Sequence, residues 1–219
     1  MPSAVNLLIL RYRKTLLKYS RLTANMKILT AERQQAPEIA SLIMTAMTDE
    51  CCLYFAGPDH SLDDFRKMMT RLAERDDSQY SYRNTLIAID DEGNIAGAIV
   101  AYDGARLHKL REAFVSSAKE CFGRDFSQMD DETQEGEVYI DSLAVFPAYR
   151  GRGIATALLR ALISKAGEEG HHAVGLLVDK GNPSAERLYR SVGFRYAGDS
   201  SWGGHPMRHL VYDIKGNRE

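Results

Sequence analysis

The sequence predicts one domain of the α/β class, with a mixed, mostly antiparallel central sheet and flanking helices. Two patterns carry this prediction: strand-like runs within 85–102 that form a hairpin pattern, and a strand, helix, strand, helix succession between 137 and 192. A hairpin pairs its strands antiparallel, whereas the strand–helix–strand unit adds parallel strands to the same sheet. At 219 residues, 44% hydrophobic and 26% charged, the chain is long enough for one such domain and a short extension.

The first half of the domain alternates a short strand with two amphipathic helices. We expect a strand in "KILTAE" at 27–32, and "QAPEIASLIMTAM" at 35–47 has apolar residues at the i, i+3, i+4, i+7 spacing of a helix. A second helix is expected after Ser61, an N-cap residue followed by acidic residues in the first turn. In the hairpin, the acidic and glycine-bearing stretch 90–94 is the expected turn.

The second half begins with a third helix and an acidic loop. A helix is expected over 104–122 because apolar residues share one of its faces, and the acid-rich stretch after it is expected to be a loop, so 103–136 forms a helical and acidic insertion. The remaining expected elements are a strand at 137–146, helices at 151–168 and 183–192, and strands at 173–178, 194–198 and 207–214. The stretch "GDSSWGGHPM" at 198–207 is expected to be a loop near the end of the chain.

Charge and cysteine content exclude several classes of protein. The 28 basic and 30 acidic residues leave a formal net charge of -2, so no overall basic field favours nucleic acid. Three cysteines without C-x-x-C spacing argue against a disulfide framework or a zinc site, and the six histidines show no metal-ligand spacing. No apolar run reaches the roughly 20 residues of a membrane span. We therefore expect a cytoplasmic protein that requires neither a metal nor a membrane.

The first 25 residues differ from the rest of the chain. They contain five basic residues and no acidic one, and their apolar residues recur at helical spacing. A basic amphipathic helix is one interpretation of this pattern. Because "MKILTAE" from Met26 looks like a domain start, we favour an extension of little functional weight at 1–25, a domain at 26–215 and a tail at 216–219.

The stretch "PAYRGRGIAT" at 147–156 places two arginines and two glycines where a strand turns into a helix. A helix N-terminus has unpaired N–H groups and a partial positive charge, and glycines let an anion approach them closely. Arg150 and Arg152 can add charge-assisted contacts. No Gly-Lys-Ser/Thr follows, which excludes a P-loop, and Thr156 stands where a dinucleotide fingerprint needs its third glycine. The turn predicts a phosphate or pyrophosphate site, against the alternative of a simple surface turn.

A second segment, "DKGNPSAERLYRSVGF", has its own helix signals: Asn182 is the expected N-cap, Pro183 the first helical residue and Gly193 the C-cap. Together the two segments resemble the signature motifs of the GNAT superfamily of N-acetyltransferases, which use acetyl-CoA to acylate amines. The family's phosphate turn, Arg/Gln-x-x-Gly-x-Gly/Ala, stands here as Arg150-Gly151-Arg152-Gly153-Ile154-Ala155. The family's later motif stands here as Asn182, Ala185, Leu188, Tyr189, Gly193 and Phe194.

The resemblance implies a GNAT-like sheet and a binding mode for acetyl-CoA. The strand before the turn is expected to carry a bulge and to splay from the next strand, which leaves a gap for the pantetheine arm. The backbone positions implied for this arm are Leu143, Ala144 and Val145. The positions implied for the pyrophosphate are Arg150, Gly151, Arg152, Gly153, Ile154, Ala155 and Thr156, with Asn182 nearer the rest of the cofactor.

The reaction needs a base for the amine, a stabilised oxyanion and an acid for the departing thiolate. Tyr189 matches the family's tyrosine acid, against the alternative of a packed aromatic residue. Strand alternation places Glu137 and Asp141 on one face, and Glu137 lies where histone-acetylating relatives carry a glutamate base. The alternatives are a solvated strand-end carboxylate, a water relay, and Asp141 as base or as anchor for the acceptor's charge. No cysteine falls on the strands at the gap, so we expect direct attack in a ternary complex.

The acceptor is expected to be a small cationic amine, because acidic residues dominate the loop that ends at Glu137. Three segments that the family leaves variable are expected to contact it: 47–82, 103–136 and 198–207, with Trp202 as a candidate lining residue. The alternatives are a protein N-terminus or lysine as acceptor, and a non-catalytic acyl-CoA-binding regulatory module. A homodimer is also considered, because homodimers are common among relatives.

Overall fold

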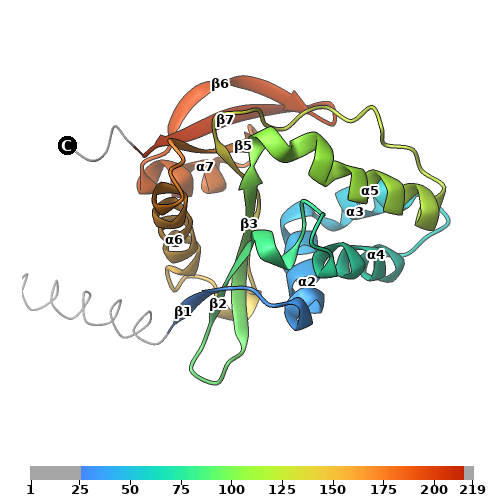
Figure 1. The fold of residues 1–219 in the computed structure, drawn as a ribbon, viewed down its shortest axis with the longest axis horizontal. Coiled ribbons are helices and arrows are strands. Elements are labelled where there is room, and N and C mark those ends of the chain that lie inside the picture. Colours follow the sequence, from blue (N-terminus) through green and yellow to red (C-terminus); the bar gives the residue numbers. More distant parts are fainter. Residues whose placement is uncertain (1–25, 215–219) are drawn as a thin grey trace, which may run out of the picture.

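The computed structural model describes residues 26–214, which form one sheet with helices on both faces (Figure 1). The amphipathic helix considered for residues 1–25 and the tail at 216–219 lie outside the described residues. The strands are β1 Lys27–Thr30, β2 Thr85–Ile89, β3 Ile95–Asp103, β4 Val138–Val145, β5 Ala173–Asp179, β6 Arg195–Trp202 and β7 His205–Asp213. Their order in the sheet is β1-β2-β3-β4-β5-β7-β6, and only β4 and β5 pair in parallel. The predicted fold class is confirmed.

The helices form two layers. They are α2 Ala36–Met47, α3 Asp49–Ala56, α4 Leu62–Glu74, α5 Leu107–Phe122, α6 Ile154–Glu168 and α7 Pro183–Val192, with short 3₁₀ segments at Arg33–Gln35, Tyr82–Asn84, Gly104–Arg106 and Pro147–Tyr149. Helices α2 to α5 cover one face of the sheet, and α6 and α7 cover the other (Figure 1). Successive side chains of a strand point to opposite faces of the sheet, so one strand can pack against both helical layers. Ile87 packs into the core under α2 and α4, while its neighbour Leu86 packs under α6.

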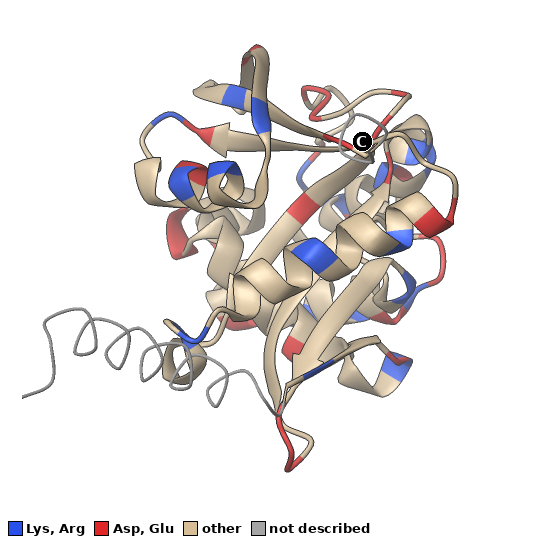
Figure 2. Cartoon of the chain, turned by 90° about the vertical axis from the view of Figure 1, so that its left-hand side faces the viewer, with Lys and Arg blue, Asp and Glu red and all other residues tan. Residues whose placement is uncertain are grey.

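The predicted hairpin joins β2 and β3 through an acidic turn, which Figure 2 shows at the lower edge of the molecule. Asp90 organises this turn, because its Oδ1 accepts hydrogen bonds from the backbone N–H groups of Glu92 and Asn94 at 3.1 and 2.8 Å. Gly93 adopts the left-handed conformation that the turn requires, with φ at 84°. The turn chemistry therefore sets the antiparallel register from which β3 leads to β4.

Helix α3 was not expected from the sequence. Its eight residues are too few to give a clear apolar period, and only Cys52, Phe55 and Ala56 are buried. Thr48 separates it from α2 with φ at 74°, and its side chain caps α3 by accepting a hydrogen bond from the N–H of Cys51. Within the described residues, no single helix is long and apolar enough to cross a membrane. One pair of helical segments, 33–47 with 49–56, has the length and composition of a span when taken together, but the two are bent by 105° where they meet.

The end of the chain corrects the sequence expectation of a loop at 198–207. This stretch is the tip of a hairpin: β6 runs for eight residues to Trp202, and the turn lies at Gly203 and Gly204, both with positive φ. Strand β6 is exposed over most of its length, so its side chains are polar and hide the strand pattern. The tip reaches the opposite helical layer, where the Trp202 ring lies 6.2 Å from that of Phe55.

The predicted N-cap of α4 gives a direct test of the helix assignment. Ser61 Oγ accepts a hydrogen bond from the N–H of Asp64 at 3.2 Å, and the Asp64 carboxylate accepts one from the N–H of Ser61 at 3.0 Å. Ser61→Ala should lower the free energy of unfolding by about 1 kcal/mol in urea denaturation. In the control Ser116→Ala, inside α5, alanine is the better helix former, so stability should stay equal or rise. Equal losses in both variants would contradict the cap.

Candidate active site

Strands β4 and β5 separate soon after they meet. They pair only at Val138 with Val174 and at Tyr139 with Gly175; beyond these residues β4 stays paired with β3, and β5 with β7. Just past this point β4 carries a bulge, because Asp141 lies between the paired residues on either side of it and has no partner on β3. The splay and the bulge implied by the resemblance are therefore both present.

The separation opens a pocket of about 220 Å³ between the two layers of helices. Its walls are Thr45 of α2, Leu143, Ala144 and Val145 of β4, Arg150 and Ala155 of the glycine-arginine turn, and Ala185, Leu188 and Tyr189 of α7. Six of the residues predicted for cofactor binding or catalysis thus line one cavity. Its lining is mostly apolar, with polar groups at the turn and on Tyr189, as in many small-molecule sites.

The backbone of the glycine-arginine turn presents a row of free N–H groups. The N–H of Arg150 donates to the carbonyl oxygen of Pro147, and the N–H of Ala157 donates to that of Gly153. The N–H groups of 151–156, between them, make no hydrogen bond to a described residue. Gly151 and Gly153 have φ at 74° and 78°, a conformation that favours glycine. This row begins α6, so the helix dipole adds to its attraction for an anion.

The two arginines of the turn brace it from outside. Arg150 Nε donates to the carbonyl oxygen of Val145 at 3.0 Å, which ties the turn to the end of β4. Arg152 Nη2 donates to the carbonyl oxygen of Ala148 at 2.9 Å, and its guanidinium lies over the ring of Tyr149. Both side chains are exposed and bring positive charge to the mouth of the pocket. Figure 2 shows basic residues beside the start of α6.

Six residues predicted for the cofactor do not line the pocket. Gly151, Arg152 and Gly153 belong to the turn described above, and the other three are Ile154, Thr156 and Asn182. Ile154 is 2% exposed and packs in the core under α6. Asn182 caps α7, since its Oδ1 accepts a hydrogen bond from the N–H of Ala185 at 3.1 Å. Thr156 lies in the first turn of α6 and makes no side-chain hydrogen bond to a described residue. Their structural roles here are packing, capping and helix initiation.

Tyr189 lies at the wall of the pocket formed by α7. Its ring packs 5.9 Å from that of Phe194, and the N–H of Phe194 donates to the carbonyl oxygen of Tyr189 where Gly193 ends the helix. Burial raises the pKa of Tyr189 to about 12. The hydroxyl therefore keeps its proton at neutral pH, which is the state that a general acid needs.

Glu137 is a buried carboxylate rather than a solvated one. It is 5% exposed and directly precedes β4. One oxygen accepts a hydrogen bond from Thr133 Oγ1 at 2.8 Å, and the other lies 2.8 Å from Nε2 of His209 on β7. The space for this carboxylate exists because Gly175 on β5 has no side chain: a Cβ there would lie 1.8 Å from Glu137 Oε2.

Asp141, the bulge residue, has a carboxylate whose pKa is raised by its surroundings. Its Oδ1 accepts a hydrogen bond from Gln79 Nε2 at 3.2 Å and its Oδ2 accepts one from Ser142 Oγ at 2.8 Å. Burial, with a smaller effect from the charge of Glu132, raises the pKa of Asp141 to about 7, against the opposing effects of these hydrogen bonds and of Arg111. A carboxylate that titrates near neutral pH is suited to proton transfer.

The acidic loop folds back over α5 and is partly neutralised there. Arg111, 6% exposed, donates to the carboxylates of Glu132 and Asp131, and Tyr102 donates its hydroxyl hydrogen to Glu132 Oε1 at 2.9 Å. Arg111 was not predicted as a site residue from the sequence, although its position four residues after Leu107 places it on the apolar face of the helix. Gln79 and His209 were not predicted either, because no sequence pattern marks them.

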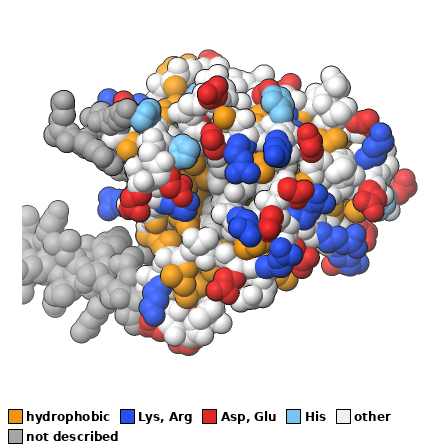
Figure 3. Space-filling model, in the orientation of Figure 1, with side chains coloured by type: hydrophobic (Ala, Val, Ile, Leu, Met, Phe, Trp, Pro, Cys, Tyr) orange, Lys and Arg blue, Asp and Glu red, His pale blue; other side chains and the backbone are white. Residues whose placement is uncertain are grey.

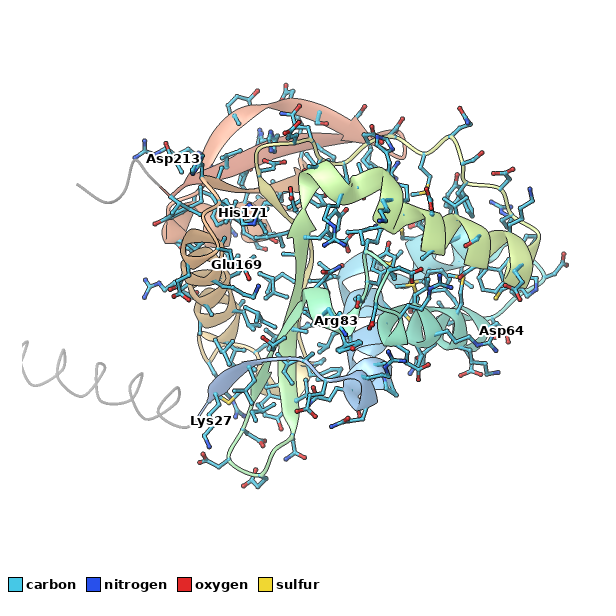
Figure 4. The ribbon with its side chains drawn as sticks, in the orientation of Figure 1. Lys27, Asp64, Arg83, Glu169, His171 and Asp213 are labelled. Atoms are coloured by element: carbon cyan, nitrogen blue, oxygen red, sulfur yellow. The ribbon has the colours of Figure 1, made fainter. Side chains whose placement is uncertain are left out.

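A larger pocket, of about 290 Å³, lies between the end of α6 and the ends of β2 to β4. Arg83, Glu169 and His171, labelled in Figure 4, are at its rim, and Figure 3 shows charged and histidine side chains around apolar ones on this face. None of the predicted catalytic or cofactor residues lines it. Within residues 26–214, no group of three or more His, Cys, Asp and Glu side chains could hold a metal ion. The smaller pocket at the splay is therefore the candidate active site.

Several known proteins are similar to this chain. Residues 44–194 match the sequence model of the Acetyltransferase (GNAT) family. An N-alpha-acetyltransferase of Arabidopsis thaliana is 38% identical over 74 residues, which cover 34% of this chain and 39% of that protein. A spermine/spermidine N(1)-acetyltransferase of Bacillus subtilis is 29% identical over 83 residues, 37% of this chain and 55% of that protein. An uncharacterized Mycobacterium leprae protein is 45% identical over 62 residues, 28% of this chain and 16% of its own length, so the matches span well under two thirds of these relatives.

Solved structures show the same architecture over most of the chain. An N-acetyltransferase from Staphylococcus aureus Mu50 superposes with a TM-score of 0.71 and 28% identity, over 85% of this chain and all of that one. A spermidine/spermine N-acetyltransferase from Vibrio cholerae superposes with a TM-score of 0.54 and 16% identity, over 88% of this chain and 96% of that one. At that identity, the second comparison shows the fold alone.

The contact between Gly175 and Glu137 predicts a strong effect of one methyl group. Gly175→Ala should displace the Glu137 carboxylate from Thr133 and His209, and so lower the free energy of unfolding by about 2 kcal/mol or more in urea denaturation. Gly198→Ala, on β6 at the edge of the same sheet, is the control, because a Cβ there meets nothing within 4 Å. Similar stability of the two variants would show that Glu137 does not need the space above Gly175.

The raised pKa of Asp141 predicts a pH-dependent stability. The folded state binds the proton of Asp141 more tightly than the unfolded state does, so protonation of Asp141 stabilises the fold. This stabilisation is fully present below the usual pKa of 3.8 and is lost as the pH rises through about 7. Asn mimics the protonated form, so Asp141→Asn should gain stability relative to the wild type between about pH 4 and about pH 8 in urea denaturation. Asp125→Asn is the control, because hydrogen bonds lower the pKa of Asp125 and it titrates below that range. A constant difference for Asp141→Asn would contradict the raised pKa.

Proposed function

This chain belongs to the GNAT acetyltransferase family, and we propose that it transfers the acetyl group of acetyl-CoA to a primary amine by direct attack in a ternary complex. The observation that carries the proposal is the pocket at the splay of β4 and β5. There an open strand edge, a row of free N–H groups at a helix N-terminus and a protonated tyrosine face one cavity. Each of the three matches one part of the acetyl-CoA molecule or one step of its reaction.

The proposed binding mode follows the chemistry of the lining. The backbone of Leu143, Ala144 and Val145 pairs with the amides of the pantetheine arm, as an added strand would. The N–H groups of 151–156 hold the pyrophosphate, and Arg150 and Arg152 add positive charge beside it. Asn182 fixes the start of α7, which carries Tyr189 on the other side of the gap.

The proposed mechanism uses the residues of the gap. Acetyl-CoA supplies the acetyl thioester. Asp141 or Glu137 takes a proton from the acceptor's ammonium, so that the nitrogen lone pair can bond to the acetyl carbonyl carbon. A backbone N–H near Leu143 stabilises the oxyanion that forms. Tyr189 then donates its proton to the sulfur as the oxyanion re-forms the carbonyl and the carbon–sulfur bond breaks. The nitrogen releases its second proton, which returns through solvent to the Tyr189 oxygen, so that an amide, the free thiol of CoA and a neutral tyrosine remain.

Asp141 is the stronger candidate for the base, with Glu137 in support. Its pKa near 7 lets it release and accept protons at neutral pH, and it occupies the bulge next to the pocket. Glu137 is held by Thr133 and His209, and so is better placed to fix the geometry of the splay or to anchor a water relay.

Direct attack is supported by the state of the cysteines. Cys51, Cys52 and Cys121 are free thiols outside the lining of the pocket. Burial raises the pKa of Cys51 to about 11 and that of Cys52 to about 12, so neither is a thiolate at neutral pH. Free thiols also support the proposal of a cytoplasmic location.

For the acceptor we propose a small cationic amine. Support comes from the half-buried Asp141 and the buried Glu132: Arg111 donates to Glu132, and its charge also acts on Asp141. The named relatives include enzymes of polyamines and of protein N-termini, so a protein amine is the alternative acceptor. Either class brings the positive charge that this acidic surrounding favours.

A thiol-release assay tests the function as a whole. Purified protein with acetyl-CoA is presented with a panel of polyamines, amino-acid amides and peptides, and CoA binding is measured in parallel by calorimetry. Release of CoA thiol that depends on an amine is the expected result. Tight CoA binding without turnover on any amine would favour a non-catalytic acyl-CoA-binding module instead.

The acid assignment predicts a specific kinetic defect. Tyr189→Phe should lower kcat by about 100-fold or more while the Kd for CoA stays within about twofold, because the ring is kept and only the proton donor is lost. Tyr196→Phe, which changes an exposed tyrosine on β6, is the matched control and should leave kcat unchanged. Full activity of Tyr189→Phe would refute the acid assignment.

A further inference from the structure

Three buried side-chain atoms within residues 26–214 have no hydrogen-bond partner: Gln79 Oε1, Arg111 Nε and Trp202 Nε1. Each comes from a different one of the three segments expected to contact the acceptor, 47–82, 103–136 and 198–207. An unpaired buried polar atom destabilises the folded state, because it has lost its hydrogen bonds to water without gaining others. Three of them at one end of the domain therefore call for a common explanation.

Gln79 and Arg111 are parts of one buried cluster. Gln79 is 3% exposed, and its backbone N–H donates to the carbonyl oxygen of Leu110, the residue before Arg111, at 3.3 Å. The Gln79 side chain and Arg111 also share a partner, since both donate to the carboxylate of Glu132. Through its second hydrogen bond Gln79 reaches Asp141 at the bulge of β4. The cluster thus adjoins the strand that lines the pocket.

Trp202 reaches the same end of the molecule from the tip of the β6–β7 hairpin. Its ring lies 6.2 Å from that of Phe55, which in turn lies 5.1 Å from that of Phe114 on the helix of Arg111. The next residue, Gly203, donates its N–H to Asp130 Oδ2 at 3.2 Å, in the loop that holds the guanidinium of Arg111. The hairpin tip is therefore fixed over the cluster.

The direction of the Gln79 amide is set by its neighbours. Ionised carboxylates only accept hydrogen bonds, so the amide nitrogen must face Asp141 and Glu132 and leave Oε1 on the other side. The hydroxyls of Tyr102 and Ser142 already donate to these carboxylates. Arg111 Nε is a donor, but it does not reach Oε1, since both atoms are unpaired. The cluster lacks one donor for Gln79 and one or two acceptors for Arg111 and Trp202.

We propose that the acceptor is a primary amine with a carbonyl group next to it, as at the amino terminus of a peptide or in an amino-acid amide. Gln79 Oε1 accepts an N–H of this amine beside Asp141, and the neighbouring carbonyl oxygen accepts from Arg111 or Trp202. A plain diamine has no acceptor group and would leave both donors unpaired. The inference rests on the proposed function and selects among its acceptors, with Gln79 and Trp202 as specificity-determining residues.

The test compares two probes, alanyl-alanine amide and 1,4-diaminobutane, with acetyl-CoA in the thiol-release assay. Wild-type protein should show a kcat/KM for the peptide about tenfold or more above that for the diamine. Trp202→Phe keeps an aromatic ring but removes the N–H, and should raise KM for the peptide about tenfold without changing KM for the diamine. Gln79→Leu should raise KM for both probes, and Tyr196→Phe on the same hairpin should change neither.

Two further measurements keep the test independent of folding and of turnover. Thermal melting checks each variant, and Trp202→Phe decides the outcome if Gln79→Leu fails to fold. Calorimetry of the CoA-loaded protein with the peptide reports binding alone. Peptide binding that Trp202→Phe weakens supports the inference even if neither probe is acetylated, a result that would count against the proposed function only. A preference for the diamine, no peptide binding by the wild type, or an unchanged peptide KM and affinity in Trp202→Phe would overturn the inference and leave the transferase proposal standing.

Discussion

The loss of pairing between β4 and β5 after Tyr139 is the constraint on which the rest of the site depends. An open edge in the middle of a sheet leaves backbone N–H and C=O groups without ladder partners, which is costly inside a protein. Here each strand keeps a ladder on its other side, to β3 and to β7, so neither collapses onto the other. Helix α6 begins beside the opening, and α7 lines it with Ala185, Leu188 and Tyr189. The gap is thus a property of the sheet order itself, and the pocket follows from it.

Two carboxylates, the buried Glu137 and the half-buried Asp141, lie on either side of Tyr139 in the chain and are held by hydrogen bonds. Glu137 is held by Thr133 and His209, and Asp141 by Gln79 and Ser142. Burying a carboxylate is unfavourable unless hydrogen bonds offset the lost hydration. For Asp141 the offset is incomplete, and its pKa is raised to about 7 as a result. The domain therefore accepts a loss of stability where a proton acceptor is useful, a pattern common at active sites.

Much of this fold could be predicted from the sequence, because local signals are strong in it. The hairpin at 90–94, the cap at Ser61 and the motif from Asn182 to Phe194 all depend on residues close in the chain. The hairpin around Gly203 was wrongly expected to be a loop, because an exposed strand has no apolar period. Gln79 and His209 also escaped prediction, since their partners Asp141 and Glu137 lie more than 60 residues away. Elements set by neighbouring residues could therefore be predicted from the sequence, whereas the long-range contacts of Gln79 and His209 could not.

The contacts at the β6–β7 tip have a consequence for the order in which the domain folds. The hydrogen bond from Gly203 to Asp130 joins residues 73 positions apart, and the ring contact of Trp202 with Phe55 spans an even longer stretch of chain. Closing such loops costs more entropy than closing the β2–β3 turn, so these contacts are gained only when many others already exist. The contacts of this tip with Asp130 and Phe55 are therefore completed late in folding, and local opening of the native protein should begin there, ahead of the β2–β3 hairpin.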